Sequence, residues 1–344
     1  MVKWTIEPLA RESAVAILAG KPHHIQSTLE WFDFIRDFTG ETDRSVSIKY
    51  CGEQIGFFCA LQHRNLIQSL PYPASYAGLQ MSRALSVVEM HELCQSLFAH
   101  YSRYCDAVTI CTGPLFGTES GSDKSFDYES TRDVHYLDLR LDPRANTTSK
   151  FRNNLRRNLQ KAERAHVRIS VSTDRGDLKK WYRCYDQRMK DLGGVLLPEK
   201  YFTAMFDCLE RRGNCWLITA KAEEKFVGGI VTVQNRHCVD YYLSMFDRKC
   251  DEMQASTAAF HFLVNYAKGF GAPILNLQSS PAAQTDLIRF KESWGAQRAQ
   301  HRYLTKIVNN RDKVLSLTES EIKKNFQFHY LLPFEALRPE MARA

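Results

Sequence analysis

Hydrophobic and polar residues follow two similar strand–turn–strand patterns, one in each half of the chain. The first covers residues 46–62 and the second covers residues 216–234. When the sequence is compared with itself at an offset of 172 positions, Ile55-Gly56 coincides with Val227-Gly228. In both patterns a polar turn is followed by an apolar residue, a glycine and a run rich in β-branched or aromatic residues. This arrangement predicts two related β-hairpins.

Similar elements follow both hairpins. The apolar periodicity predicts the helices 87–104 and 254–268 and the strands 107–111, 239–246 and 274–278. Polar stretches at 117–130 and 142–149 are typical of a loop and an interdomain linker. We therefore predict an α+β fold with mixed sheets and two tandem domains of similar order. The predicted parts are an N-terminal domain (1–145), a C-terminal domain (146–310) and a tail with a helix at 319–328 and a loosely packed end (311–344).

A strongly basic helix opens the second half of the chain. Between Lys150 and Arg168 there are seven Lys or Arg residues and one acid, Glu163, while the whole protein carries a formal net charge of +7. Phe151 and Leu155 belong to an apolar stripe at helical spacing. The other face brings like charges together four residues apart, which costs roughly 0.2–0.5 kcal/mol per pair in an isolated helix. A bound polyanion would offset this cost, but a solvated basic face is the simpler alternative.

Composition places the protein among ordinary globular proteins. The chain has 344 residues, of which 44% are hydrophobic and 25% charged, enough for two domain cores. The positive net charge favours anionic partners such as nucleic acid, nucleotide phosphates or CoA. Ten cysteines are scattered singly without a CxxC pair, which predicts neither a zinc ribbon nor a disulfide framework.

The N-terminus has no features of a secretion signal. Its apolar run, residues 14–20, is short and is preceded by charged residues. No run approaches the ~18 apolar residues that a transmembrane helix requires. We therefore expect a soluble, cytoplasmic protein.

Four segments resemble the FemABX-type, tandem-GNAT acyltransferases, including the group with a BioF2-like acetyltransferase domain. They are the basic helix leading into a strand, the second hairpin with the following YYLSMF strand, the run LIRFKESWGA, and the loop SLPYPASYAGLQ in the first half. The similarity extends over roughly residues 25–305. It implies two GNAT-like domains, with the acyl-transfer site in the second.

The chain departs from the family pattern at two places. The strand before the FK motif reads Asn276-Leu277-Gln278, where the family often has an acidic residue. The glycine-rich pyrophosphate loop of single-domain GNAT acetyltransferases is replaced by DRKCDEMQASTAA. A helix that begins near Gln254 could still offer free backbone N–H groups to an anion, with Ser256 or Thr257 as caps.

Lys291 and Tyr242 are the candidate catalytic residues. Phe290 and Trp294 would anchor a short helix and leave Lys291 free to point into a groove, where its charge could meet a phosphate or a developing oxyanion. The alternative is a surface lysine beside a structural aromatic pair. Strand alternation places one of Tyr241 and Tyr242 in the core and the other beside the groove, and we favour Tyr242 as the residue that lines it.

Phosphate groups of a donor or of a nucleotide-linked acceptor would be bound by guanidinium and ammonium groups of the basic helix. The candidate anion-binding residues are Arg152, Arg156, Arg157 and Lys161, together with Ser256 and Thr257. We expect Lys291 to lie across the groove from this helix.

The sequence contains no motif that predicts a metal site or covalent catalysis. No HxxxH or HExxH spacing is present, so we expect no metal site. His261 lies in an apolar helix, where a packed histidine is the simplest interpretation. No GxSxG elbow is present and no cysteine has a recognisable activating partner, so direct attack by the acceptor amine is favoured over a covalent intermediate.

Three functions are compatible with these features. The first is an N-acyltransferase that moves an acyl group, with acyl-CoA as co-substrate, to an amine. The second keeps the fold but uses aminoacyl-tRNA and a cell-wall precursor; it would require a wider basic surface than residues 150–168 provide. The third is a non-catalytic RNA- or nucleotide-binding module on the same fold. The acceptor, the acyl length and the oligomeric state are not predicted.

Overall fold

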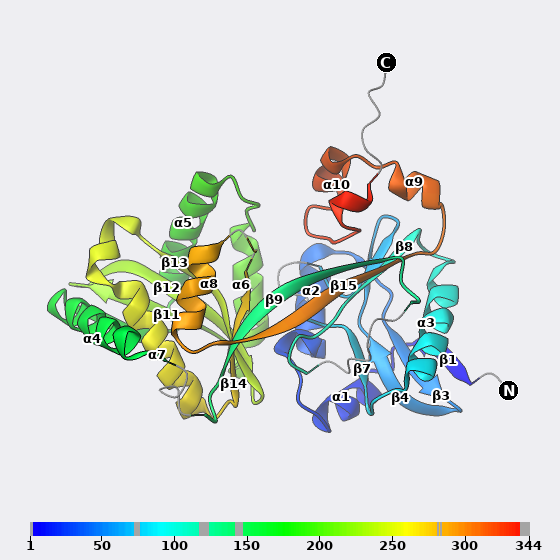
Figure 1. Ribbon diagram of the computed structural model, residues 1–344, viewed down its shortest axis with the longest axis horizontal. Helices are drawn as coiled ribbons and strands as arrows, with labels where there is room; N and C mark the ends of the chain where they lie inside the picture. Colours follow the sequence, from blue (N-terminus) through cyan, green and yellow to red (C-terminus); the bar gives the residue numbers. More distant parts are fainter. Residues whose placement is uncertain are drawn as a thin grey trace, which may run out of the picture. The chain divides into compact units, whose positions relative to one another are not determined.

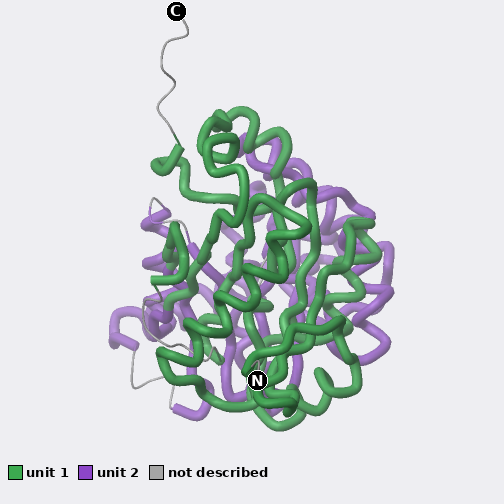
Figure 2. The backbone as a smooth tube through the Cα atoms, turned by 90° about the vertical axis from the view of Figure 1, so that its right-hand side faces the viewer, with its two compact units in different colours: residues 1–132, 300–344 green, residues 133–299 purple. Residues whose placement is uncertain are grey.

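The computed structural model describes residues 3–71, 76–116, 124–141, 147–280, 282 and 284–337. The chain divides into two compact units, which Figure 2 shows in different colours: unit 1 consists of residues 1–132 and 300–344, and unit 2 of residues 133–299. Both contain mixed helix and sheet, which confirms the predicted α+β class. In the described part of the chain, no helix is long and apolar enough to cross a membrane.

Unit 2 is a twisted sheet with helices on both faces (Figure 1). Its strands follow the order β10-β11-β12-β13-β14-β9, and all neighbours are antiparallel except the parallel pair β13–β14. The strands are β9 (Tyr128–Asp138), β10 (Val167–Ser172), β11 (Cys215–Ala222), β12 (Lys225–Asn235), β13 (Cys238–Phe246) and β14 (Ile274–Ser279). The helices are α4 (Ser149–Arg164), α5 (Arg175–Leu192), α6 (Glu199–Leu209), α7 (Ala255–Phe270) and α8 (Thr285–Ser293), with the short 3-10 helices η2 (Glu210–Arg212) and η3 (Arg248–Met253).

The alternation of side chains in β13 separates the two faces of this sheet. Tyr241 packs edge-on against Phe260 of α7, whereas the hydroxyl of Tyr242 lies 2.6 Å from that of Tyr201 in α6. Phe151 of α4 and Trp294, which follows α8, belong to the same apolar cluster as Phe260. Helices α4, α7 and α8 therefore share one face of the sheet, and α6 lies on the other.

Unit 1 contains two groups of strands. One has the order β1-β3-β4-β7, and in the other β15 pairs with β8 and the order continues β8-β6-β5-β2. The strands are β1 (Trp4–Pro8), β2 (Thr42–Asp43), β3 (Val46–Tyr50), β4 (Glu53–Phe58), β5 (Leu61–His63), β6 (Leu66–Gln68), β7 (Leu79–Met81), β8 (Ala107–Cys111) and β15 (Gln297–Ile307). The helices are α1 (Arg11–Ala19), α2 (Leu29–Thr39), α3 (Val87–Tyr101), α9 (Arg311–Leu315) and α10 (Glu319–Asn325), with the 3-10 helices η1 (Ile25–Ser27) and η4 (Phe334–Ala336).

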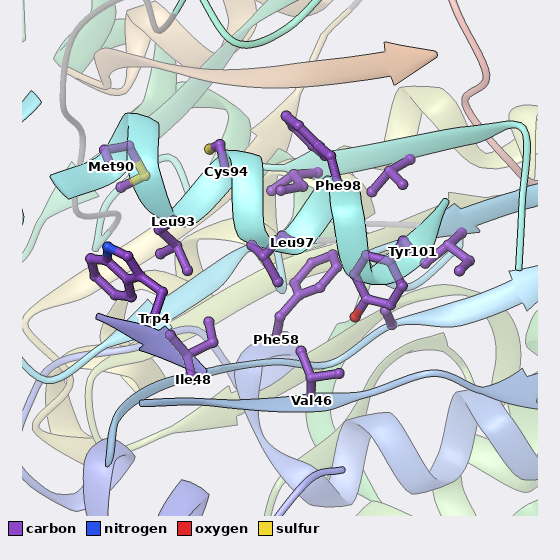
Figure 3. Close-up of a cluster of buried hydrophobic side chains, with 14 of the residues drawn as sticks. Trp4, Val46, Ile48, Phe58, Met90, Leu93, Cys94, Leu97, Phe98 and Tyr101 are labelled. Atoms are coloured by element: carbon purple, nitrogen blue, oxygen red, sulfur yellow. The ribbon is translucent and has the colours of Figure 1, made fainter. Parts of the chain in front are cut away.

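Helix α3 covers the first sheet of unit 1. Ser86 and Glu89 form a capping box that starts the helix. The buried side of α3, including Leu93 and Leu97, then packs against Trp4 of β1 and its neighbours on β3 and β4 (Figure 3).

The two predicted hairpins share one irregularity. In the β3–β4 pair, Ile55 has no residue opposite it, because Ile48 faces Gly56 and the next residue, Lys49, faces Gln54. In the β11–β12 pair, Val227 has no residue opposite it, because Lys221 faces Phe226 and Ala220 faces Gly228. Both bulges occur at equivalent positions at the offset of 172 found in the sequence. This agreement supports a duplicated hairpin beyond a chance likeness of pattern.

The compact units differ from the predicted domains. Strands β9 and β15 each contribute residues to both units, and the chain returns to unit 1 after β15. The C-terminal residues share an apolar core with β6 and β8; its members include Leu66, Ala107, Val314, Leu331 and Leu332. The expectation of a loosely packed tail is therefore wrong for the described residues up to 337. Parts of the predicted loops 117–130 and 142–149, of the loop 69–80 and of the tail lie outside the described residues.

Candidate functional site

The basic helix predicted at the start of the second half is α4. The hydroxyl of Thr148 accepts a hydrogen bond from the backbone N–H of Phe151 at 3.1 Å and caps the helix. Phe151 and Leu155 pack into the apolar cluster of α7, and the Phe151 ring meets that of Trp294 at 5.3 Å. Burial of this stripe fixes the helix on the sheet and leaves its basic residues exposed.

A groove of about 960 Å³ lies between α4 and α7, and Trp294 contributes to its lining. Arg152 and Arg156 line it from α4, and Lys268 lines it from α7. Arg157 and Lys161 are absent from its lining, because they lie on a different side of α4. The predicted cluster of four cations is therefore divided between two faces of one helix.

Most of these cations have no acidic partner. In the described part of the chain, no ion pair involves Arg156, Arg157 or Lys161. Arg157 donates only to the side chain of Asn154 at 3.3 Å, and Arg152 donates to the backbone oxygen of Thr147 at 2.5 Å. Among the described residues, the positive charges of Arg156, Arg157 and Lys161 are thus left to solvent or to an anionic ligand.

The start of α7 is a second potential site for an anion. Gln254 is the N-cap, with φ of 55°, and its side chain does not cap the helix. Ser256 and Thr257 lie within the first turn, so the expectation that either acts as a cap is wrong. The Thr257 hydroxyl instead donates to the Gln254 side chain at 3.2 Å. Because the first turn contains no acidic residue, its backbone N–H groups present a positive end.

The strands β13 and β14 form a fork at the centre of the unit 2 sheet. They pair only between Cys238–Asp240 and Ile274–Asn276. Beyond this point β13 continues beside β12 as far as Phe246, and register skips Tyr242, which forms a β-bulge. β14 pairs with β9 from Ile274 to Asn276, and this pairing resumes at Ser279 after an irregularity at Leu277 and Gln278. The distal half of β13 therefore has a strand edge that β14 does not pair.

A buried carboxylate lies at the base of the fork. Asp240 is fully buried, and its Oδ1 accepts hydrogen bonds from Asn276 Nδ2 at 2.6 Å and from Gln278 Nε2 at 3.1 Å. Gln278 is held in the left-handed region with φ of 62°, and its backbone N–H donates to Asn276 Oδ1. The acid missing from the strand before the FK motif is thus supplied by the neighbouring strand. Sequence reasoning missed Asp240, although a lone acid in the apolar run CVDYYLSMF was a usable signal.

Lys291 lies beside the end of β14 and does not line the groove between α4 and α7. Its side chain is buried, and Nζ donates to the backbone oxygen of Gln278 at 2.9 Å and to Ser280 Oγ at 2.8 Å. Burial lowers the pKa of Lys291 to about 7. The expectation that Lys291 is free and faces α4 is therefore wrong, because the end of β14 surrounds its amine. Through Gln278 it is linked to Asp240.

Two further side chains adjoin this network. Tyr242 occupies the bulge and is buried, with its hydroxyl paired to Tyr201 on the α6 side of the sheet. It does not line the groove between α4 and α7, so the expectation that Tyr242 is the groove-lining tyrosine is wrong. His135 of β9 is fully buried, and neither of its ring nitrogens has a hydrogen-bond partner among the described residues. Burial lowers the pKa of His135, and the nearby charges of Lys291 and Arg298 lower it further. No sequence motif distinguished His135 from a core residue.

The lowered pKa of Lys291 predicts a pH-dependent contribution to stability. Unfolding returns this pKa from about 7 toward 10.5, so between these values the unfolded chain binds a proton that the native state has released. Compared with the variant Lys291→Met, the wild type should gain free energy of unfolding as pH rises from 7 to 10, by up to about 1.4 kcal/mol per pH unit. Urea unfolding across this range measures the difference.

The exposed Lys179 provides the control for this experiment. Lys179→Met should show no such trend against the wild type. A wild-type advantage over Lys291→Met that does not change between pH 7 and pH 10 would mean that the buried amine keeps its proton, contrary to the assignment.

Comparison with known proteins agrees with this geometry. The family model of the acetyltransferase (GNAT) domain matches residues 149–277. Among solved structures, FemX is similar with a TM-score of 0.64 and 12% identity, covering 87% of this chain and 97% of that chain. No curated protein matches the chain in sequence.

Two more solved structures extend the comparison. A tandem GNAT protein from the clavulanic acid biosynthesis pathway, solved without AcCoA, has a TM-score of 0.50 and 9% identity, covering 90% of this chain and 99% of that one. The C-terminal domain of an Agrobacterium fabrum protein named as a lysylphosphatidylglycerol synthetase has a TM-score of 0.55 and 11% identity. The match covers 91% of this chain and 95% of that chain. At such identities the similarity establishes the fold.

Proposed function

We propose that the protein is an N-acyltransferase that takes its acyl group from acyl-CoA and passes it to an amine. The proposal is supported by the match of residues 149–277 to the GNAT acetyltransferase domain and by the FemABX-like tandem-GNAT fold. The observation that carries the proposal is the fork, where β14 stops pairing with β13 beside a buried carboxylate. A CoA donor places the reaction in the cytoplasm.

Each part of the donor has a matching feature in unit 2. The amide groups of the pantetheine arm can add to the open edge of β13 as an extra strand would. The pyrophosphate suits the first turn of α7, where the N–H groups near Ser256 and Thr257 are directed outward. Arg152 and Arg156 would bind the remaining phosphate of the donor or a phosphate of the acceptor. The thioester then lies at the fork.

The residues at the fork can complete the reaction without a covalent enzyme intermediate. The acceptor amine attacks the thioester carbon, and backbone N–H groups of the β13 edge stabilise the oxyanion. Asp240 accepts the proton released from the amine nitrogen as the N–C bond forms. The C–S bond then breaks, and the Tyr242 hydroxyl protonates the departing thiolate. Lys291 is assigned as a positioning residue, because it fixes Gln278 and thereby the orientation of Asp240.

Binding of the donor is the first test. Calorimetry with a panel of acyl-CoA esters should show saturable binding of one ester per chain, and CoA without an acyl group should compete. Absence of binding to every member of the panel would exclude acyl-CoA as the donor.

The unpaired charge on α4 favours a second candidate, in which the donor is aminoacyl-tRNA. Arg157 and Lys161 have no role in the CoA proposal, yet they extend the basic surface beyond the groove. A protein that neutralises several phosphates releases counterions, so its affinity falls steeply with salt. RNA that copurifies with the protein and dissociates with such a salt dependence would support this candidate; transfer of an aminoacyl group would separate it from a non-catalytic RNA-binding module.

A further inference from the structure

A second cluster of ionisable side chains lies in unit 1, whereas the residues assigned to acyl transfer belong to unit 2. It combines Glu41, which precedes β2, with His63 at the end of β5 and His329, which follows α10. One potential ligand atom from each residue lies within 4.8 Å of the others. The three residues are distant in sequence, so a search for local metal-binding spacings does not find them.

The contacts of His63 determine which ring nitrogen carries hydrogen. Its Nε2 lies 2.7 Å from the backbone oxygen of Asn325, which can only accept, so Nε2 carries the hydrogen. Its Nδ1 lies 2.9 Å from Glu41 Oε1. In neutral His63 this nitrogen has a lone pair, which would face a carboxylate oxygen. A positive species, either a proton or a metal ion, is therefore required between these two atoms.

A proton on His63 leaves other atoms unsatisfied. Glu41 Oε2 is buried without a hydrogen-bond partner. His329 Nε2 lies 2.9 Å from Glu41 Oε1, but its direction is unsuited to a hydrogen bond. The His329 ring is also stacked on that of His63, with centroids 4.2 Å apart, so a second positive ring there would be repelled. A single cation with several coordination positions accepts a lone pair from His63 Nδ1, from His329 Nε2 and from the Glu41 carboxylate.

We propose that Glu41, His63 and His329 bind a divalent cation of the zinc class and, within unit 1, fasten the C-terminal segment to the end of β5. Two imidazole nitrogens and one carboxylate form a common Zn²⁺ ligand set that leaves a position for water. Bonds of about 2.0–2.2 Å place tetrahedral ligand atoms roughly 3.3 Å apart, a few tenths of an ångström more than the 2.9 Å separations from Glu41 Oε1. The stacked rings of His63 and His329 must also turn apart, because a metal ion lies in the plane of each imidazole that binds it. The hydrogen bond from His63 to Asn325 is the outer contact that orients a metal-bound imidazole.

Calorimetry on untagged, chelator-treated protein tests the proposal with Zn²⁺ as the probe. The wild type should bind one Zn²⁺ per chain, and His329→Gln and Glu41→Gln should each weaken binding by at least about 100-fold. The matched control is His166→Gln, since His166 is exposed and lies in unit 2; it should bind Zn²⁺ as the wild type does. Mg²⁺ should not compete, because it prefers oxygen ligands.

A second measurement covers the case in which a variant folds poorly. Co²⁺ added to the wild type should give the intense visible spectrum of tetrahedral coordination, and Zn²⁺ should abolish it by displacement. Stoichiometric binding that both variants leave within twofold of the wild type would show an adventitious ion and overturn the proposal. Failure of the wild type to bind Zn²⁺ would also overturn it, and would indicate a protonated His63–Glu41 pair. Neither result affects the acyl-transfer assignment in unit 2.

Discussion

Replacing Asp240 with asparagine should reduce kcat for acyl transfer by about 100-fold or more, because the amine proton loses its acceptor. Asparagine has nearly the same size and keeps an oxygen that can accept from Asn276 and Gln278. The network should therefore persist, and KM for the acyl-CoA should change little. Steady-state thiol release in the presence of an amine acceptor measures both constants.

The control for this variant is Asp286→Asn, which removes an equal charge from an exposed position on α8. It should leave kcat unchanged, and both variants should show the circular dichroism spectrum of the wild type. If Asp240→Asn is folded and retains full kcat, Asp240 is a structural residue and the proposed reaction lacks its base.

Neutralising the groove side of α4 should weaken binding of the acyl-CoA by at least about 100-fold. The double variant Arg152→Gln/Arg156→Gln removes two cations that line the groove. Each charge-assisted hydrogen bond to a phosphate contributes about 1.5–3 kcal/mol, and two such losses exceed that change in Kd. Calorimetry at constant ionic strength gives the affinity.

The same helix supplies the matched control. Arg157→Gln/Lys161→Gln removes equal charge from residues that do not line the groove. For a CoA ligand this variant should bind as the wild type does. For tRNA both double variants should weaken binding and reduce its salt dependence, because a polyanion spans both faces of α4. If both double variants weaken acyl-CoA binding equally, α4 contributes only its overall positive charge and makes no specific contact with the donor in the groove.

Much of the fold followed from periodicity in the sequence. The hairpins, α3, β8, α4, β13, α7 and β14 lie where the apolar patterns predicted them, since each buries a continuous stripe or an alternating face. The strand β9 was missed. Its first half, with Glu129, Thr131 and Arg132, is exposed and reads as a polar loop. Because most residues of this segment are polar, it does not show the alternation of apolar and polar residues that predicts a strand.

The division of the chain was less predictable. A boundary drawn from composition assumes that each domain is continuous in sequence. The return of the chain through β15 to a core that includes Leu66 and Val314 depends on contacts between distant segments. Local composition carries no information about such contacts.

The candidate site was predicted in part, for the same reason. The basic helix and its apolar stripe are local features, so α4 and the start of α7 were found. Lys291 was chosen from a motif, but its burial follows from the turn at Gln278, which no pattern indicates. Asp240 became a candidate only when β14 placed Asn276 and Gln278 beside it. Such networks join residues from different strands and need the three-dimensional structure.

The fork between β13 and β14 is the proposed place of acyl transfer. A crystal structure with a non-hydrolysable acyl-CoA analogue tests this most directly. We expect the pantetheine arm along the open edge of β13, with the carbon that replaces the thioester carbonyl within reach of Asp240. An analogue bound elsewhere, with the fork filled by side chains, would contradict the assignment.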